Sequence, residues 1–548
     1  MPYLPVSCQQ DRNPLNRHSA GRRLLSPCEK QASDIFTRHL LIHSGLSRSS
    51  GFHAKVYRTT PVHSQFKLFL LLVLSLSFAA VQAQTPSPLP SDTLPPPAKQ
   101  QDTSRVPYRY PFIVGEIFIK GNRITRSYII TRELPFKKGD TLYIQDLVGT
   151  FKHAKERIIN TRLFNDVVIA VKEFRGFVVD IEIQVKERWY IFPLPYVRPV
   201  DRNFTAWAQH NYSLSRLDFG VKYSHYNFTG RNDYLRAWLI TGYSNQVELA
   251  YDLPYVGRTL KHGFGVGFFY NGFKEINAAT INNQQYFMNS DTIPYAGKYM
   301  REQLSFSLRY YYRPALKIRH AFRLGYNRLN IDSSVTIVNP HYFNNNKTQI
   351  FYPEFNYALT YNNIDYVPYP LNGFYLQTGF TRKGINSDMN LWQLTAKTYQ
   401  GFPLWRKTYF VTQNLGLISL PFKQPFYNQQ FVGYGDYYMR GFEKYVVDGV
   451  FGGLSRNTLL RELFNFNIPF LRGTSHDVIP IRIYAKTYVD FGYVDNKYFR
   501  DNSLVNKFLY SGGLGVDVVT FYDFVFRFEY SINQLGEKGF YFHIRNDF

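Results

Sequence analysis

Cysteine and long apolar runs are both scarce in this chain. Its 548 residues contain 2 cysteines, Cys8 and Cys28, which lie before the segment that we predict to direct export. The exported part therefore contains none, which excludes a disulfide scaffold, a cysteine metal site and a thiol nucleophile. The longest apolar run, Leu68 to Ala80, has 13 residues, too few for the roughly 20 of a membrane-spanning helix.

Motifs of the common enzyme classes are absent as well. There is no HExxH, no Walker A, no GxSxG nucleophile elbow and no GxGxxG in a strand-helix setting, so we expect neither an enzyme nor a bound cofactor or metal. The net charge of +24 would suit nucleic acid, but the basic residues are scattered and form no basic-aromatic module. A nucleic-acid partner is therefore not expected.

The short apolar run has the features of a secretory signal peptide. Lys67 supplies a positive flank, 68–74 the apolar stretch, and Val81-Gln82-Ala83 a small-residue cleavage site. We therefore predict a signal peptide at 66–83 and a mature chain that begins at Gln84. The alternative, a buried core helix, is opposed by the proline-rich segment that follows at once.

The segments on either side of the signal peptide are expected to lie outside the folded part. Residues 1–65 form a long polar extension, which does not normally precede a signal peptide. We interpret this extension as an over-extended gene start. Residues 84–111 are rich in proline and are predicted to form a linker.

Aromatic residues, by contrast, are abundant. The chain has 45 Tyr and 48 Phe against 5 Trp and 5 Met, a bias toward residues that favour strands and membrane interfaces. Over 195–548, apolar and polar residues alternate in many segments, as Phe526 and Phe528 do with Arg527 and Glu529. We therefore expect an all-β transmembrane fold, a 16-stranded antiparallel outer-membrane β-barrel. The alternative is a soluble β-sandwich.

The candidate strands also predict which way the chain crosses the membrane. We count sixteen, from 202–213 to 539–548, and the long gaps all follow odd-numbered strands. These gaps are 273–298, 330–348, 418–456 and 492–507. Since periplasmic turns are short and extracellular loops long, the part before the first strand is expected in the periplasm.

That preceding part, 112–188, is predicted to be a small α/β module in the order β-α-α-β-β. Along this module the spacing of apolar residues changes from the alternation of a strand to the period of a helix and back again. The expected elements are strand 113–119, helices 127–134 and 145–161, and strands 167–171 and 177–185. The alternative is a generic ferredoxin-like packing unit, since a fold alone implies no function.

Short motifs in both parts resemble those of a known superfamily. The module has Gly121-Asn122 after its first strand and Val185-Lys186-Glu187 at its end, in an order similar to that of POTRA domains. Between strands eleven and twelve, Met439-Arg440-Gly441-Phe442 looks like a barrel-plugging loop. The chain thus resembles the POTRA-plus-barrel outer-membrane superfamily, also called bacterial surface antigen barrels. This superfamily contains the BamA- and TamA-like assembly factors and the two-partner secretion transporters.

The resemblance implies a contact that holds this plugging loop, 418–456, inside the barrel. In the family the loop arginine reaches an acid on strand thirteen, and alternation puts Asp490 on the lumenal face of that strand. Arg440 and Asp490 are therefore the expected pair. Gly441 would allow a close approach and Phe442 would pack beside it. A second acid, which the family often places on strand twelve, is replaced by Asn465, a candidate lumenal partner.

The alternative is that Arg440 is a solvated arginine in a mobile loop.

Two further sequence features lead to predictions about the barrel. Gly263, Gly265 and Gly267 share one face of strand five, which suggests either lumenal space for the loop or a bend of the barrel. Phe548 ends an alternating strand at the C-terminus, a feature similar to the signal by which bacterial barrel proteins are recognised for insertion.

A POTRA domain implies a periplasmic module that offers a strand edge to unfolded clients. In such strand addition, main-chain hydrogen bonds provide affinity without requiring one client sequence. The candidate edge is the second strand of the module. It consists of Val167, Val168, Ile169, Ala170 and Val171.

The resemblance as a whole implies a protein of the bacterial outer membrane that assists insertion or translocation of other polypeptides. Clients would pass at the seam between the first strand, near 204–212, and the last, 539–548. The partners implied are unfolded outer-membrane or secreted polypeptides, outer-membrane lipids and accessory lipoproteins. The alternatives are a dedicated two-partner-type secretion transporter and a passive porin or surface-binding barrel.

Overall fold

The computed structural model describes seven stretches of the chain. They are 110–199, 213–294, 296–385, 388–469, 478–497, 502–520 and 523–544. The expected signal peptide and N-terminal extension, nearly all of the linker, and Phe548 lie outside the described residues. No helix within the described stretches is long and apolar enough to cross a membrane.

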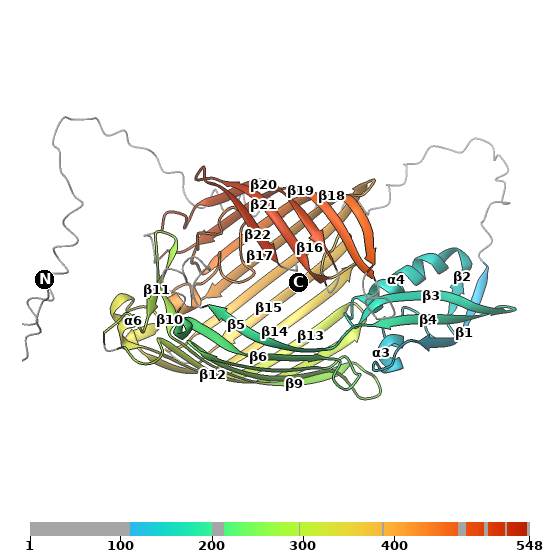
Figure 1. Ribbon diagram of the computed structural model, residues 1–548, viewed down its shortest axis with the longest axis horizontal. Coiled ribbons are helices and arrows are strands. Elements are labelled where there is room, and N and C mark those ends of the chain that lie inside the picture. Colours follow the sequence, from blue (N-terminus) through green and yellow to red (C-terminus); the bar gives the residue numbers. More distant parts are fainter. Residues whose placement is uncertain are drawn as a thin grey trace, which may run out of the picture. The chain divides into compact units, whose positions relative to one another are not determined.

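The small domain is a four-stranded sheet with two helices (Figure 1). Its elements are β1 (Pro111–Lys120), α3 (Ser127–Thr131), β2 (Thr141–Tyr143), a 3-10 turn (Ile144–Asp146), α4 (Leu147–Ile159), β3 (Phe164–Arg175) and β4 (Val178–Glu187). The strand order is β2-β1-β4-β3, with β1 and β4 parallel and the other pairs antiparallel. Sequence periodicity did not predict β2, because three residues are too few to show alternation.

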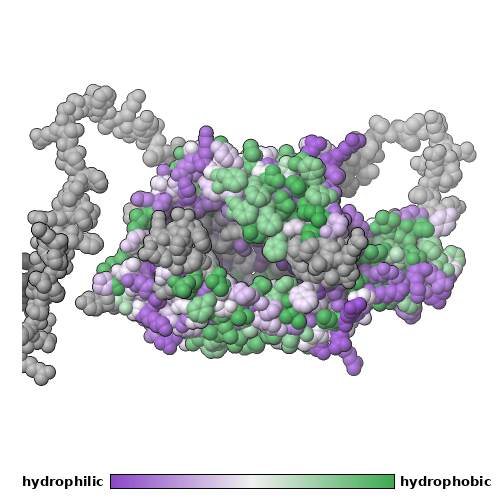
Figure 2. Space-filling view, viewed as in Figure 1, coloured by the Kyte–Doolittle hydropathy of each residue, from purple (hydrophilic) through white to green (hydrophobic). Residues whose placement is uncertain are grey.

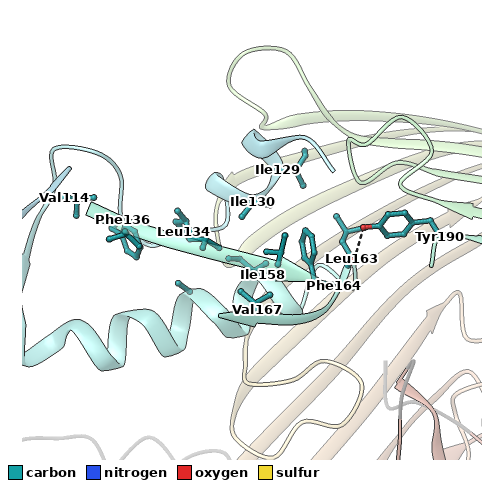
Figure 3. Packing of buried hydrophobic residues seen from close by; sticks show 14 residues of the cluster. Val114, Ile129, Ile130, Leu134, Phe136, Ile158, Leu163, Phe164, Val167 and Tyr190 are labelled. Atoms are coloured by element: carbon teal, nitrogen blue, oxygen red, sulfur yellow. Dashed lines mark hydrogen bonds between the residues drawn. The ribbon is translucent and has the colours of Figure 1, made fainter. Parts of the chain in front are cut away.

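The core of this domain is apolar and lies between the sheet and the helices (Figure 3). On α4 the buried residues Leu147, Ala154 and Ile158 are seven and four positions apart, which places them on one helix face. Phe164 on β3 is fully buried, and burying such a side chain contributes roughly 1.5–3 kcal/mol. The Tyr190 hydroxyl donates a hydrogen bond to the Leu163 carbonyl at 2.9 Å and closes one end of the core.

A second sheet of sixteen antiparallel strands curves into a barrel (Figure 1). In order these are β5 (Ile191–Pro199), β6 (Leu217–Tyr226), β7 (Tyr234–Gly242), β8 (Asn245–Val256), β9 (His262–Phe273), β12 (Arg301–Ala315), β13 (Ile318–Ile331), β14 (Gln349–Ile364), β15 (Gly373–Lys383), β16 (Leu391–Trp405), β17 (Thr408–Leu420), β18 (Phe451–Pro469), β19 (Val478–Asp495), β20 (Phe508–Val519), β21 (Val525–Asn533) and β22 (Lys538–Ile544). The expected fold class and strand count are confirmed.

The first barrel strand of the described sheet is β5 at Ile191–Pro199, which pairs with β6. The segment 202–213, where the sequence places the first strand, lies almost entirely outside the described residues. Pro193 and Pro195 hid this strand, because proline has no N–H to donate to a ladder and is typical of linkers. An edge strand, which needs hydrogen bonds on one side only, tolerates proline.

The connections contain the remaining short elements. The hairpin β10 (Glu275–Ile281) and β11 (Gln284–Asn289) follows β9, and α6 (Ser333–Val338) follows β13. Single 3-10 turns occur at Leu214–Arg216, Asn344–Asn346 and Phe426–Asn428. The long connections follow β9, β13, β17 and β19, the fifth, seventh, eleventh and thirteenth strands of the barrel.

The two faces of the barrel sheet carry opposite kinds of side chain. Apolar residues such as Leu514, Phe540 and Phe542 point outward and are exposed, and Figure 2 shows apolar residues gathered over β19–β22. Arg527 and Glu529, which alternate with outward residues on β21, are buried. This is the arrangement expected of a barrel with lipid outside and a polar lumen inside.

Candidate functional site

The connection from β17 to β18, residues 421–450, folds on an apolar core of its own. Val432 and Val447 pair through two backbone hydrogen bonds of 3.1 and 2.9 Å. Phe431, Met439 and Phe442 are buried in the same apolar cluster, which also contains inward-facing residues of the surrounding strands. The loop is therefore a packed unit, and this packing fixes where Arg440 lies.

Arg440 and Asp490 meet inside the barrel. The Arg440 Nε donates to Asp490 Oδ2 at 2.8 Å, its Nη2 donates to Oδ1, and its backbone N–H donates to Oδ2 at 3.2 Å. The side chains are 6% and 0% exposed. A planar guanidinium and a carboxylate that bond through two parallel N–H groups form the strongest common type of ionic hydrogen bond.

Other groups complete the surroundings of this guanidinium. Its Nη1 donates to Thr458 Oγ1 on β18 at 3.0 Å, and its carbon lies 3.9 Å from the centre of the Tyr488 ring. Glu529 on β21 lies 3.9 Å from Nη1. The arginine thus contacts β18, β19 and β21. Removing a single partner would leave a buried charge, which typically costs about 3–5 kcal/mol.

Gly441 and Phe442 occupy the places that the sequence predicts for them. Gly441 has φ +83, and a Cβ there would come within 3.3 Å of the Ser511 side chain on β20. Its carbonyl accepts a hydrogen bond from Asn533 Nδ2 at 2.8 Å. Phe442 is 3% exposed within the loop core. Glycine is needed because other residues rarely adopt this φ and the loop here touches the wall.

The wall itself makes room through small residues that sequence reasoning missed. On β20, Ser511, Gly513 and Gly515 face the lumen, and Gly513 pairs with Tyr488 and Gly515 with Lys486. A Cβ at Gly513 would lie 2.6 Å from the Tyr488 hydroxyl. The alternation of Gly513 and Gly515 with Leu514 and Val516 was a readable signal.

The expectation for strand five was less accurate. Gly265 and Gly267 on β9 face Arg309 of β12, not the plugging loop, and Arg309 pairs with Asp252 at 2.9 Å. Gly263 lies against the backbone of Pro254. These glycines give space to neighbouring strands, because a large lumenal side chain from β12 fills the gap first.

Asn465 is not the partner of Arg440. It is exposed on β18, while Thr458, seven residues earlier, makes the contact. At about 3.3 Å per residue this separates the two by about 23 Å. The register of β18 on β19 also shifts between Glu462 and Phe464, so Glu462 pairs with the buried Tyr484. This bulge puts Glu462 on the lumenal face, whereas strict alternation counted from Asn465 would put it on the outer face.

A second ionic network adjoins the contacts of Arg440 and shares Glu529 with them. Lys486 on β19 pairs with Asp517 on β20 and with Glu529 on β21, the latter at 2.7 Å. Tyr369, from the connection between β14 and β15, donates to Asp517 at 2.9 Å. His543 on β22 lies 3.6 Å from Glu529. Charged groups therefore join the plugging loop to the last four strands of the barrel.

The loop is also held at its other end by a single asparagine. Asn283, at the tip of the β10–β11 hairpin, is fully buried. Its Nδ2 donates to the Val446 carbonyl at 3.2 Å, and its Oδ1 accepts from the Leu504 N–H at 3.1 Å. Three long connections thus meet at one residue. The sequence offered no signal for this contact, because Asn-Asn in a hairpin turn is ordinary.

In the small domain, the candidate client strand lies at an edge of the sheet. β3 pairs with β4 and has no second neighbour among the described strands. Of the five candidate residues, Val167 is buried in the core, Val168 and Ala170 are exposed, and Ile169 and Val171 are partly buried. At the end of β3, hydrogen bonds from Arg175 and the Glu116 N–H hold the pKa of the Asp180 carboxyl below its usual range.

The barrel sheet also has two ends among the described residues. β5 pairs only with β6, and β22 pairs only with β21. The segment at 204–212 and the terminal Phe548, which the sequence assigns to this seam and to the insertion signal, lie outside the described residues. Within the described ranges no group of three or more His, Cys, Asp or Glu side chains could hold a metal ion.

Comparison with protein families decides the affiliation of this arrangement. The model of the Omp85 superfamily domain matches residues 227–548, more than half of the chain. The chain belongs to the Omp85 superfamily. The POTRA model, described as a surface antigen variable number repeat, matches 112–188. This Omp85 chain is accordingly an outer-membrane protein with a periplasmic POTRA domain.

Two solved structures are similar to this chain at low sequence identity. BamA from Haemophilus ducreyi lacking POTRA domains 1–3 is 18% identical, with 79% of this chain and 83% of that chain covered and a TM-score of 0.43. CdiB from Escherichia coli is 13% identical, with 79% and 76% covered and a TM-score of 0.47. No curated protein sequence matches the chain significantly.

Proposed function

We propose that this Omp85 protein assists the insertion or translocation of other polypeptides at the outer membrane, in the manner of BamA- and TamA-like assembly factors. The observation that carries the proposal is the plugging loop, which is fixed by Arg440 and Asp490 beside the last strands of the barrel. A passive pore needs no such contact. A barrel that must stay closed until a client arrives does.

Client capture would begin at the free edge of β3. Its unpaired side offers backbone N–H and C=O groups to an extended chain, and Val168 and Ala170 stand exposed beside them. Strand addition of this kind provides affinity through main-chain hydrogen bonds and needs little sequence specificity. A folding client would supply the energy for the later steps.

Release into the membrane would occur beside β22. Among the described strands it pairs only with β21, so its other side is open to an incoming strand. His543 on this strand lies against Glu443 of the loop at 3.6 Å. Movement of the loop and opening of the seam would therefore be coupled.

Depletion of the protein tests the proposal. Mass spectrometry of the outer-membrane fraction and of the culture medium should show broad loss of barrel proteins from the membrane. A strain with Arg440→Ala should show the same loss in part. The matched control is Arg406→Ala, because Arg406 is an exposed arginine in the turn between β16 and β17.

Other outcomes would favour the alternatives. Loss of one secreted protein with an unchanged membrane would identify a dedicated two-partner-type transporter. Steady ion conductance that persists when residues 112–188 are deleted, with both proteomes unchanged, would identify a porin or a surface-binding barrel. A strain with Arg440→Ala that behaves as the Arg406→Ala strain would remove the role proposed for the loop.

A further inference from the structure

A small cavity of about 40 Å³ lies inside the barrel against Arg440. A single water needs roughly 10–15 Å³ by the same kind of measure, so the space would hold one chloride-sized ion with a water. Its wall is formed by the plugging loop and by several strands of the C-terminal half of the barrel. It belongs to no contact described above.

Positive side chains dominate the wall of this cavity. Four cationic residues and one carboxylate line it, and the carboxylate is Asp517. The cations come from four different elements: Arg440 from the loop, Arg456 from β18, Lys486 from β19 and Arg527 from β21. A cation placed there would be repelled by four like charges, whereas an anion would be attracted by all of them.

Three of the five charged groups already have partners in the barrel. Asp490 neutralises Arg440, and Lys486 lies between Asp517 and Glu529. The hydroxyl of Tyr369 donates to Asp517, so it is not available to a ligand. The charges in these pairs neutralise one another, and Arg456 is the side chain that we expect to bind a ligand.

Arg456 is buried and incompletely paired. It is 7% exposed and stacks 4.4 Å from the centre of the Tyr438 ring, but its Nε has no hydrogen-bond partner among the described residues. Asp490 is its cross-strand neighbour, yet both oxygens of Asp490 accept from Arg440. A buried guanidinium in this state costs free energy unless a negative charge is supplied.

We infer that this cavity is a binding site for a small monovalent anion, held chiefly by Arg456. The anion neutralises a buried charge between the plugging loop and β18, and so stabilises the loop in its lumenal position. The site is independent of which polypeptide the barrel handles. Its ligand is either a free halide or a carboxylate group, two anions with the same charge and similar needs for N–H donors.

Thermal unfolding of the full chain in detergent tests this site. The melting temperature is measured in sodium chloride and in sodium gluconate at equal ionic strength, because gluconate is too large for the cavity. We expect a saturable rise in chloride: at about ten times its Kd a ligand raises the folded-to-unfolded ratio about elevenfold. Equal melting temperatures in the two salts would overturn the inference.

Variants assign the effect to the cavity. In Arg456→Met, which keeps a long apolar side chain and removes the charge, the difference between chloride and gluconate should disappear. Arg236→Met is the matched control, since Arg236 is a lumenal arginine of β7 paired with Glu248, and it should keep the difference. A chloride effect that survives Arg456→Met contradicts the assignment.

A crystal grown in bromide gives a readout that does not depend on any variant folding. An anomalous peak within hydrogen-bond distance of Arg456 supports the site, and its absence at saturating bromide refutes it. Sodium acetate separates the two ligand classes. Stabilisation equal to that in chloride means that the site also accepts a carboxylate group, and stabilisation in chloride alone means that it is a halide site.

Discussion

The small domain and the barrel differ in the side chains that their sheets bury. In the small domain the core between sheet and helices is apolar, with residues such as Phe164 and Ile181. In the barrel they include Arg440, Asp490 and Glu529, while apolar residues such as Leu308 point outward at 63% exposure. The two parts differ in this way because the surface of the small domain faces water and the outer surface of the barrel faces lipid.

The difference shows what holds each part together. In water, removal of apolar surface from solvent is the main favourable term. In lipid that term is absent between strands, so the ladder hydrogen bonds and the pairing of lumenal charges carry the stability. The same kind of substitution should therefore change the stability of the two parts by different amounts.

Loss of the lumenal carboxylate should be the most damaging change. Asp490→Ala would leave Arg440 buried without its partner, at a cost of about 3–5 kcal/mol. The plugging loop should then become sensitive to added protease in intact cells. Asp490→Glu, which keeps the charge, is the control and should restore most of the resistance. A resistant loop in Asp490→Ala would mean that the apolar core of the loop is sufficient.

Removal of apolar bulk should act on the small domain alone. Phe164→Ala should destabilise it by about 3 kcal/mol, through lost burial and a residual cavity. The reporter is thiol labelling of Ala154→Cys, a fully buried position, in a chain that begins at Gln84 and so has no other cysteine. Labelling should rise while the barrel melting temperature stays constant. A fall in that temperature would show that the two parts unfold together.

An arginine placed on exposed apolar surface should destabilise the barrel much more than the small domain. Leu308→Arg, in the middle of β12, should destabilise the barrel in lipid vesicles by about 2 kcal/mol. Val148→Arg, at 81% exposure on α4, should change the small domain by less than about 0.5 kcal/mol. Urea midpoints measure both. Equal effects would mean that Leu308 does not face hydrocarbon.

The smallest effect is a pH dependence of the small domain. The pKa of Asp180 is lowered in the folded state by hydrogen bonds from Arg175 and Glu116. Its contribution is therefore present above the ordinary carboxyl pKa of about 3.9 and is lost as the pH falls through the lowered value.

The check is a comparison of the urea midpoints of wild type and Asp180→Asn from neutral pH to about pH 3. Wild type should be the more stable at neutral pH, and the two stabilities should converge in acid. A difference that stays constant over this range would mean that the carboxylate charge contributes nothing.

Much of the site follows from the local pattern of the sequence. The alternation of β19 places Asp490 on the lumenal face, and Met439-Arg440-Gly441-Phe442 marks the loop that meets it. The edge position of β3 also follows from the order of the elements. These features are visible because a period of two residues and a short motif are properties of adjacent positions.

Other features needed the folded chain. The bulge between Glu462 and Phe464 puts Glu462 on the same lumenal face as Asn465, so the face of Glu462 was assigned wrongly. Asn465 faces Arg482 of β19, far from Arg440, and Thr458, which makes the contact, was missed. Proline concealed β5, although its place at a sheet edge makes proline acceptable. In each case the deciding partner lies on another strand, which a count along one strand cannot reveal.

The sequence by itself determined the class of fold, the number of barrel strands and the lumenal face of Asp490, while the resemblance of its motifs to a known family implied that Arg440 pairs with this acid. Only the tertiary structure decided that Gly513 and Gly515 leave space for Tyr488 and Lys486 of β19, and that Asn283 bonds to the loop carbonyl of Val446. It alone placed Arg456 beside a cavity without a full set of partners. The physical reason is that alternation is written along one strand, whereas space and charge balance arise between strands that are distant in sequence.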